Sequence, residues 1–225
     1  MLRRAIDAVV AGRTSVRFGL AAAIVLLAIG IAVRLLWRPD ETPQAHFIEV
    51  GDSAYILPKP DPVAAFKLVN HDGAAFDNAD LKGKWTFVFF GFTHCPDLCP
   101  TTLNVFNQVH RQLRAQPQGV RDVRFVFVSV DPERDTPQLL KEYVTAFNPE
   151  FVGVSGNGAE LAQLAESLGV VYTKVPGATA EQYFMDHSSA VLLIGPRGTL
   201  SGVFAAPHVA QKITAGFQAI RERTR

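Results

Sequence analysis

Two cysteines, four residues apart, are the residues of this chain whose type and spacing point most directly to chemistry. They lie in the stretch 94–100, HCPDLCP, directly after the apolar run 85–92 and directly before a run with helical spacing at 101–116. Open α/β sheets bind ligands where the carboxyl end of a strand leads into a helix. Because a helix N-terminus stabilises anions, we expect a thiolate at this position to have a lowered pKa.

The three residues between the cysteines leave several kinds of site open. Thioredoxin-type oxidoreductases have two intervening residues, whereas this spacing sets the sulfurs about one helical turn apart. The pair could then close a disulfide or hold one ion. Two soft thiolates suit Cu(I), and an added imidazole lets the site also hold Cu(II), whereas structural zinc needs four ligands. The alternatives without chemistry are a structural disulfide or two cysteines that only fill the core.

A third ligand would come from one of six histidines. His187 lies between two expected strands, in the loop where thioredoxins carry a cis-proline facing the cysteines, and no proline occurs here between Pro176 and Pro196. His94 is next to Cys95 and is a weaker candidate. The spacing alone leaves an alternative for His187, because a histidine beside a strand can simply be held by hydrogen bonds without binding a metal. His46, His71 and His208 are expected to be solvent-exposed. His110 lies within an expected helix and is expected to pack against it or to lie at the surface.

Alternating strand and helix patterns from residue 63 onward would position these residues. Nearly continuous apolar runs predict strands buried on both faces, and apolar residues at helical spacing predict helices. The expected strands are 66–69, 74–76, 85–92, 124–130, 151–155, 170–175, 183–187, 190–194 and 200–204. The expected helices are 101–116, 136–147 (with Thr136 as N-cap and Pro137 at its first position), 159–168 and 207–223. This order predicts an α/β thioredoxin-like sandwich with an N-terminal hairpin extension.

The N-terminal part differs in composition from the rest. Residues 18–37 are apolar apart from Arg34, and they are long enough to cross a bilayer as one transmembrane helix if Arg34 snorkels to the interface. Residues 1–17 are rich in arginine, so the positive-inside rule keeps them in the cytoplasm and exports the rest of the chain. A cleaved signal peptide would need a small-x-small cleavage site, and no convincing one follows the apolar run. A buried core helix would not normally be apolar on all sides next to a cluster of arginines. We therefore expect an anchor, a proline-rich tether at 38–62 and a folded domain at 63–225.

The charge of the chain argues against one class of partner. Lysine and arginine total 22 and aspartate and glutamate total 21, with no basic stripe after the N-terminal segment. A domain that binds nucleic acid usually carries such a stripe. We expect a membrane and proteins as partners, and no nucleic acid.

Three separated motifs resemble the Sco/SenC family of copper chaperones. They are FFGFTHCPDLCP at 89–100, SVDPERDTP at 129–137 and DHS at 186–188. The three occur in the order found in that family, and the resemblance extends over about residues 60–222. The single anchor ahead of a tether is similar too.

The resemblance implies a thioredoxin fold and ligation of one copper ion, as Cu(I) or Cu(II), by Cys95, Cys99 and His187. It also implies service to the subunit of cytochrome c oxidase that carries the binuclear copper site. Asp131 is carried over as a residue that supports the site, and capping of the turn at 132–134 is its alternative role. The expected location is the inner membrane, with the folded domain in the periplasm, or the mitochondrial intermembrane space for an organellar protein.

The same residues would fit a thiol–disulfide oxidoreductase, but they conflict with a peroxidase. Cys95 and Cys99 could be the catalytic pair of a thiol–disulfide oxidoreductase that keeps the copper-site cysteines of the oxidase reduced. Apart from this activity we do not expect an enzyme. Peroxiredoxins share the fold but place a threonine three residues before the reactive cysteine, and that position is Phe92 here. Another periplasmic copper carrier or a thiol reductant would be an additional partner.

Overall fold

The computed structural model describes residues 24, 26–32, 34, 48–50, 54–117, 119–177, 179 and 182–224. The chain divides into two units, residues 1–45 and 46–225.

A large mixed sheet forms the centre of the second unit. Its strands are β1 (Ile48–Glu49), β2 (Ala54–Pro62), β3 (Lys67–Asn70), β4 (Ala75–Asp77), β5 (Trp85–Gly91), β6 (Val123–Ser129), β7 (Val152–Ser155), β10 (Val191–Ile194) and β11 (Thr199–Phe204). The order across the sheet is β1-β2-β11-β10-β5-β6-β7-β3-β4. Neighbours β5, β6 and β7 run parallel, and all other neighbours are antiparallel. A separate antiparallel pair is formed by β8 (Tyr172–Pro176) and β9 (Tyr183–His187).

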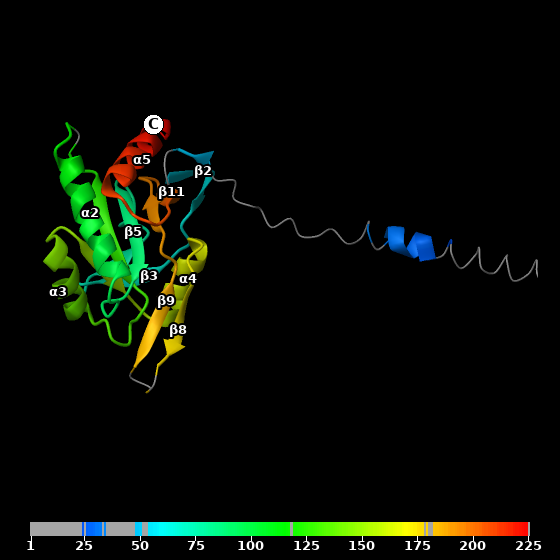
Figure 1. Cartoon of the computed structure of the whole chain (residues 1–225), viewed down its shortest axis with the longest axis horizontal. Coiled ribbons are helices and arrows are strands. Elements are labelled where there is room, and N and C mark those ends of the chain that lie inside the picture. The colour runs from blue at the N-terminus through cyan, green and yellow to red at the C-terminus, as the bar shows by residue number, and fades with distance from the viewer. Residues whose placement is uncertain are drawn as a thin grey trace, which may run out of the picture. The chain divides into compact units, whose positions relative to one another are not determined.

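Four helices of the described residues pack on this sheet. They are α2 (Leu98–Arg114), α3 (Pro137–Phe147), α4 (Gly158–Ser167) and α5 (Ala210–Arg223). Helix α2 contacts both α3 and α5, and these three cover one face of the sheet, whereas α4 lies on the other side (Figure 1). The expected α/β sandwich is thus confirmed.

Aromatic side chains fill the space between the sheet and helices α2 and α5. Every residue of β5 is buried, as its continuous apolar run predicted. The ring of Phe87 stacks on Phe125 of β6 with centroids 5.0 Å apart and lies 5.3 Å from Phe217 of α5. Each buried aromatic side chain contributes a few kcal/mol of hydrophobic stabilisation. This packing fixes the position of β5, at whose carboxyl end the cysteine segment begins.

The hairpin extension is confirmed as β3 and β4. The side-chain oxygen of Asn70 accepts hydrogen bonds from the backbone amides of Asp72 and Ala74 at 2.9 and 3.0 Å, which closes the turn. Gly73 has a φ of 81°, a conformation that glycine adopts without steric cost. The hairpin extends the sheet because β3 pairs with β7.

Residues 54–62 lie in the segment that the composition assigned to a tether, and the structure folds them into β2. This strand pairs with β11 from Ala54 to Pro62. An edge-type strand tolerates prolines when their missing amides are not needed by the neighbouring strand. The folded unit therefore includes residues before 63.

Helix boundaries differ from the expected ones by a few residues. Helix α2 begins at Leu98 rather than at 101, because Pro100 in the first turn loses no intrahelical hydrogen bond. Cys99 is therefore part of the helix. Helix α5 begins at Ala210 rather than at 207. The cap of α3 is as expected, since the hydroxyl of Thr136 accepts a hydrogen bond from the Leu139 amide at 3.3 Å.

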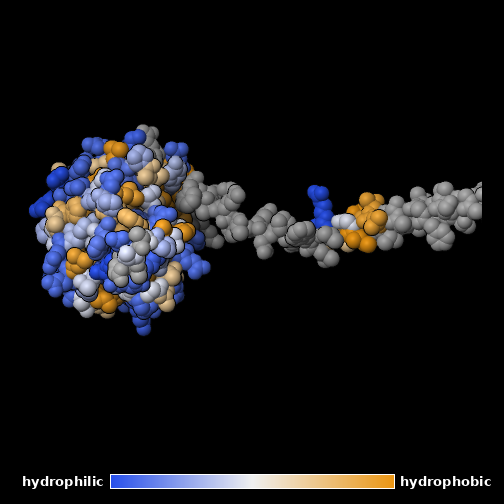
Figure 2. All heavy atoms as spheres, turned by 60° about the horizontal axis from the view of Figure 1, so that its bottom comes forward, coloured by the Kyte–Doolittle hydropathy of each residue, from blue (hydrophilic) through white to orange (hydrophobic). Residues whose placement is uncertain are grey.

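In the first unit the described residues 24, 26–32 and 34 are helical. Their large apolar side chains are exposed, with Leu26 at 69% and Leu27 at 67% (Figure 2). Among the residues that the structure describes, no helix is both long enough and apolar enough to cross a membrane. The rest of the expected anchor at 18–37, all of 1–17 and residues 38–47 of the expected tether lie outside the described residues.

Candidate metal centre

Three side chains from two distant parts of the sequence meet beside the carboxyl end of β5. The loop after β5 carries Cys95, the first turn of α2 carries Cys99, and the last residue of β9 is His187. One ligand atom from each of the three lies within 4.8 Å of the other two. This is the only group of three or more cysteine, histidine or carboxylate ligands that the described part of the chain brings together in this way.

The separations in this group fit one ion. With bond lengths of about 2.0 to 2.3 Å, three ligands in a plane around an ion lie about 3.5 to 4 Å apart. The Cys99 Sγ and His187 Nε2 atoms are 3.6 Å apart and already lie in this range. The widest separation, at most 4.8 Å, needs to close by only about 1 Å to reach it. The donor set of two sulfurs and one imidazole suits copper in either oxidation state.

The imidazole of His187 is oriented for ligation. Its Nδ1 lies 3.0 Å from the backbone carbonyl of Ser188, and only an N–H at Nδ1 makes this a hydrogen bond. Nε2 then carries the lone pair that a metal needs. The rings of Phe89 and Phe92 stand at steep angles to the imidazole, with centroids 5.8 and 6.0 Å away, and fix its plane.

The two cysteines have different surroundings. Cys95 is half-buried, and its sulfur accepts a hydrogen bond from the Cys99 amide at 3.4 Å. Cys99 is buried, and burial raises the pKa of its thiol well above the ordinary value, with Cys95 and Asp135 adding to the rise. The lowered pKa expected from the sequence is therefore wrong for Cys99, because desolvation outweighs the helix N-terminus.

Gly91 is required by the close approach of Cys99 to the end of β5. A β-carbon at this position would lie 2.7 Å from the Cys99 sulfur and 2.7 Å from Cε2 of Phe127. Such contacts are too short for van der Waals packing. The glycine that ends β5 thus makes the space in which the buried sulfur lies.

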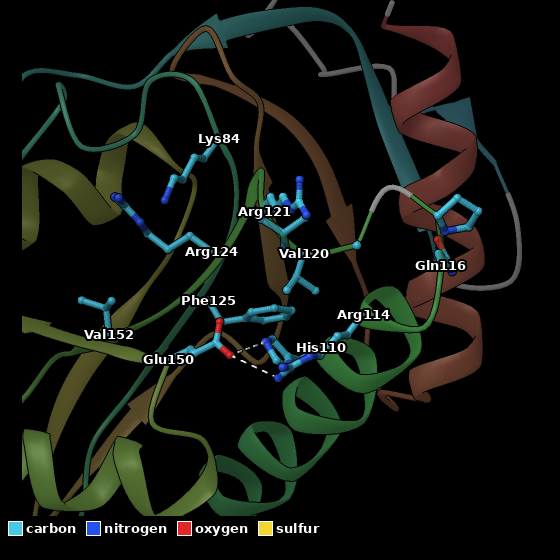
Figure 3. Close-up of a pocket in the computed structure, with 13 residues that line it drawn as sticks. Lys84, His110, Arg114, Gln116, Val120, Arg121, Arg124, Phe125, Glu150 and Val152 are labelled. Atoms are coloured by element: carbon cyan, nitrogen blue, oxygen red, sulfur yellow. Dashed lines mark ion pairs between the residues drawn. The ribbon is translucent and has the colours of Figure 1, made fainter.

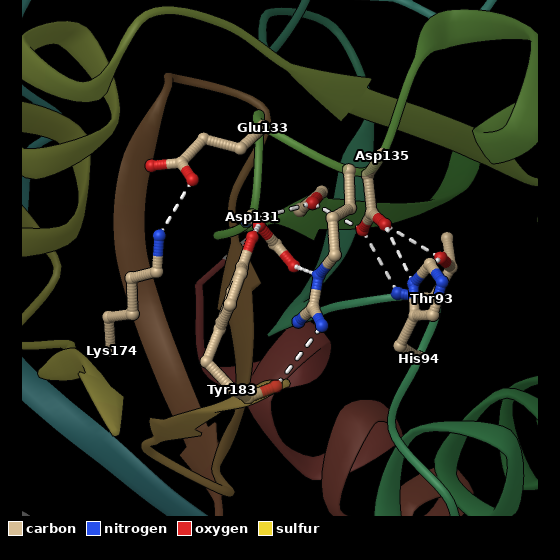
Figure 4. Close-up of polar contacts among 9 residues, drawn as sticks. Thr93, His94, Asp131, Glu133, Asp135, Lys174 and Tyr183 are labelled. Atoms are coloured by element: carbon tan, nitrogen blue, oxygen red, sulfur yellow. Dashed lines mark hydrogen bonds and ion pairs between the residues drawn. The ribbon is translucent and has the colours of Figure 1, made fainter. Parts of the chain in front are cut away.

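Asp131, the expected supporting residue, does not belong to the ligand group. Its buried carboxylate accepts a hydrogen bond from the hydroxyl of Tyr183 at 2.7 Å and pairs with Arg134 (Figure 4). Arg134 also donates to the backbone carbonyl of Tyr183 at 3.1 Å and lies over its ring at 3.7 Å. Because Tyr183 begins the strand that ends in His187, Asp131 contacts the opposite end of β9 from His187. The turn after Asp131 is closed by its backbone carbonyl, which accepts from the Arg134 and Asp135 amides, and not by its side chain.

Asp135 is a functional residue that the sequence reasoning did not single out, although it lies in the motif at 129–137. Its buried carboxylate accepts hydrogen bonds from the Thr93 amide at 2.9 Å, the Thr93 hydroxyl at 2.6 Å and the Ser129 hydroxyl at 2.6 Å. Asp135 thereby fixes the loop that carries Cys95 (Figure 4). A second aspartate within a short motif that follows a buried strand is the signal that could have found it.

The other described histidines are placed outside the ligand group. His94 Nδ1 contacts the Thr93 hydroxyl at 3.0 Å. His71 was expected to be solvated, but its side chain is only 9% exposed and its Nδ1 accepts from the Gly153 amide at 3.0 Å. His208, expected to be exposed, is half-buried and contacts the Thr102 hydroxyl at 3.2 Å. His110 packs in the core. His46 lies outside the described residues.

Comparison with known proteins supports a common ancestry for the whole folded unit. The sequence profile of the SCO1/SenC family matches residues 57–222. The mitochondrial protein SCO2 homolog of Homo sapiens is 40% identical to this chain over 149 residues, which cover 66% of this chain and 56% of that protein. The match thus spans little more than half of that relative's length.

Solved structures agree with this match. The crystal structure of Arabidopsis thaliana ScoI with copper bound has a TM-score of 0.67 and 35% identity, covering 72% of this chain and 99% of that one. Yeast Sco1 with copper bound has a TM-score of 0.65 and 28% identity, covering 73% and 89%. From the family match over most of its length, and from the fold that it shares with these structures, the chain is a member of the SCO1/SenC family.

Proposed function

We propose that this protein is a copper chaperone that binds one copper ion through Cys95, Cys99 and His187. The observation that carries the proposal is the convergence of their three ligand atoms within 4.8 Å. The unprotonated Nε2 of His187 and the soft sulfurs form a donor set for which copper is the matching ion. Copper bound in the Arabidopsis and yeast relatives supports the same assignment.

The copper ion is the cargo, and the exposure of the ligands sets the order of its transfer. Cys95 and His187 are half-buried, whereas Cys99 is buried. An incoming thiolate of a partner therefore reaches the ion from the side of Cys95 and His187 and replaces these ligands first. Transfer exchanges sulfur and nitrogen ligands without oxidation of the ion, and the released cysteines take up protons.

A copper(I) titration of the reduced full chain against a chelating probe tests the binding step. We expect one ion per chain for the wild type, and a large loss of affinity for His187→Ala. His94→Ala is the matched control, because His94 adjoins Cys95 but lies outside the ligand group. Failure of the reduced wild-type chain to bind copper at stoichiometric level, or equal losses in both variants, would contradict the proposal.

For the destination of the copper, the resemblance to the Sco/SenC family supports the binuclear copper site of cytochrome c oxidase. We propose that the chain is held in the inner membrane by residues 18–37 with its folded unit in the periplasm, or in the mitochondrial intermembrane space if the protein is organellar. Mixing the copper(I)-loaded chain with the reduced copper-site domain of an oxidase should move copper to that domain, as measured by the copper content of the two proteins after they are separated. Retention of all copper on the chaperone would contradict this destination.

A second candidate function is thiol–disulfide exchange with the cysteines of the same oxidase subunit. The two free thiols lie within reach of each other, and one of them is half-buried and accessible. In that reaction, oxidation of the two thiols to a disulfide would supply the two electrons that reduce a disulfide of the partner. His187→Ala separates the functions: loss of copper transfer with retained exchange supports the chaperone, and retained oxidase maturation supports the oxidoreductase.

A further inference from the structure

A basic pocket of about 760 Å³ opens at the end of the sheet opposite to the ligand group (Figure 3). Lys84 immediately precedes β5, and Val123 and Val152 are the first residues of β6 and β7. The pocket therefore lies at the amino ends of the parallel strands, whereas the cysteines follow the carboxyl end of β5. Nothing in the proposed copper chemistry uses this pocket.

The charges that line this basic pocket are strongly unbalanced. Its lining includes the cations of Lys84, Arg114, Arg121 and Arg124, against the single carboxylate of Glu150. Glu150 Oε1 lies 3.7 Å from Arg114 Nη1. This distance is longer than the roughly 2.7 to 2.9 Å of a charge-assisted hydrogen bond, so the one carboxylate neutralises little of the charge.

The other three cations of the pocket are not neutralised either. Within the described part of the chain, Lys84 and Arg121 make no ion pair, and Arg124 donates to the backbone carbonyl of Asp80, which carries no net charge. The carboxylate of the adjacent Asp122 is engaged by an arginine of α5 at 2.6 Å. Lys84 and Arg124 are both half-buried, so water screens their charges less than it would at the open surface.

His110 adds a buried hydrogen-bond donor to the same pocket. The residue is 4% exposed, and its Nδ1 lies 3.3 Å from the side-chain nitrogen of Asn148. The backbone amide of Glu150 donates to the side-chain oxygen of Asn148 at 2.9 Å. This hydrogen bond orients the Asn148 side chain so that its nitrogen faces the imidazole of His110. Nδ1 is therefore an acceptor, and the proton of the neutral ring lies on Nε2. This buried Nε2 makes no hydrogen bond of good geometry, but Glu150 Oε1 lies 3.4 Å from it, so the donor faces the carboxylate of the pocket itself (Figure 3).

The apolar part of the lining indicates what else the occupant carries. Val120, Val123, Phe125 and Val152 contribute side chains between the cations. An inorganic ion would leave these groups unused, whereas an organic group attached to the anion would contact them. Arginine forks bind phosphate oxygens in pairs, and a lysine adds a point charge.

We propose that this basic pocket binds an organic phosphate ester. The phosphate lies among Lys84, Arg121 and Arg124, and the organic part lies on the apolar lining. A soluble phosphate ester and the headgroup of an anionic phospholipid share this chemistry, and the experiment separates the two sources.

The test is a titration of the full chain in uncharged detergent micelles, followed by the amide NMR signals of residues 119–124. The probes are sn-glycerol 3-phosphate in solution and phosphatidylglycerol added to the micelles, with glycerol as the uncharged control. We expect binding to weaken about tenfold in Lys84→Gln and in Arg121→Gln, because each loses a charged hydrogen bond. Arg111→Gln is the matched control, since Arg111 lies one turn before Arg114 on α2 but does not line the pocket.

Glu150→Gln gives a change of opposite sign. Removal of the only carboxylate should tighten binding, and a damaged fold could not produce this result. Binding of glycerol phosphate identifies a soluble ligand, and binding of phosphatidylglycerol alone identifies a lipid headgroup. Absence of signal shifts with both probes at millimolar concentration, or equal weakening in Arg111→Gln and the two pocket variants, would overturn the proposal.

Discussion

Cys95 and Cys99 are separated by a single helical turn, yet their surroundings give them different parts in copper handling. The Cys95 sulfur lies at the N-terminus of α2 and is half-buried, so in the proposed transfer it is one of the two ligands that a partner reaches first. Cys99 is buried against Gly91 and Phe127 and keeps its proton until a metal displaces it. His187 completes the group with a nitrogen whose lone pair is held available by the Ser188 carbonyl.

Copper(I) affinity should depend on pH because Cys99 must lose its proton on binding. Burial raises the pKa of this thiol, so it is protonated throughout the neutral range. Each proton released on binding makes the apparent affinity rise about tenfold per pH unit. Competition titrations between about pH 6 and 8 should show at least this slope for the wild type. An affinity independent of pH over that range would contradict the protonated state of Cys99.

Gly91→Ala should weaken copper binding without altering any ligand. The added β-carbon would lie 2.7 Å from the Cys99 sulfur, which must shift away from the other two ligand atoms. We expect at least about a tenfold loss of copper(I) affinity, together with a destabilisation of about 1 to 3 kcal/mol from overpacking. Gly158→Ala is the matched control, because a β-carbon there meets nothing within 4 Å. Unchanged affinity in Gly91→Ala would show that the sulfur position tolerates displacement.

At the scale of elements, the three side chains of the site lie on the cysteine loop with the start of α2 and on strand β9, and both are held by the short segment between β6 and α3. The segment between β6 and α3 holds the cysteine loop through Asp135 and the His187 strand through Asp131 and Arg134. Strands β5 and β6 run parallel and pair up to Gly91 and Ser129, so the loops after them emerge side by side. This arrangement brings the motifs at 89–100, 129–137 and 186–188 together in space.

Tyr183→Phe tests how β9 is positioned. Removal of the hydroxyl leaves the buried Asp131 carboxylate with one fewer donor, which should cost about 1 to 3 kcal/mol in the free energy of unfolding. Copper(I) affinity should fall as well, because His187 lies at the other end of the same strand. Denaturant unfolding and copper competition measure the two effects.

Tyr172→Phe is the control for this change. Tyr172 pairs with His187 in the register of β8 and β9 but makes no hydrogen bond through its hydroxyl within the described residues. We expect a much smaller effect on both quantities. Equal effects of the two substitutions would refute the special role of the Asp131 contact.

At the scale of the whole molecule, the two ends of the sheet carry different chemistry. The proposed copper ligands lie beside the carboxyl end of β5, and the basic pocket lies at the amino ends of β5, β6 and β7. The core between them is dominated by stacked phenylalanine rings. Each site can therefore be altered by substitution without direct contact with the other.

Acid should destabilise the folded unit through buried, neutral histidines. Burial lowers the pKa of His71, and its Nδ1 must stay unprotonated to accept from the Gly153 amide. The unfolded chain takes up this proton below about pH 6.5, before the native state does. Stability should thus be level above that pH and fall as pH decreases from about 6.5 toward the lower native pKa.

His71→Asn should reduce this acid sensitivity, since the Asn side-chain oxygen takes the place of Nδ1, can still accept the Gly153 hydrogen bond and does not titrate. Urea unfolding of both proteins at several pH values measures the effect. The same steepness of the pH dependence in both would contradict the assignment. His208, whose pKa burial also lowers, contributes the part that remains.

The local patterns of the sequence were sufficient to predict the elements and the cysteine pair, but not the contacts that depend on folding. The continuous apolar run of β5 and the Thr136 cap are local signals, and the structure bears both out. The whole of β2 was missed, because prolines in a polar segment are also typical of a tether. The raised pKa of Cys99 depends on burial by residues distant in sequence, which spacing does not encode. His187 was selected among the histidines by the family motifs, and the structure brings it to the two cysteines.

X-ray absorption at the copper edge of the full chain, loaded with one equivalent of Cu(I), measures directly whether copper binds through two sulfurs and one nitrogen. The arrangement of Cys95, Cys99 and His187 predicts a first shell of two sulfurs and one nitrogen, and the loss of that nitrogen in His187→Ala. A shell of sulfur alone in the wild type, or an unchanged nitrogen contribution in the variant, would contradict it.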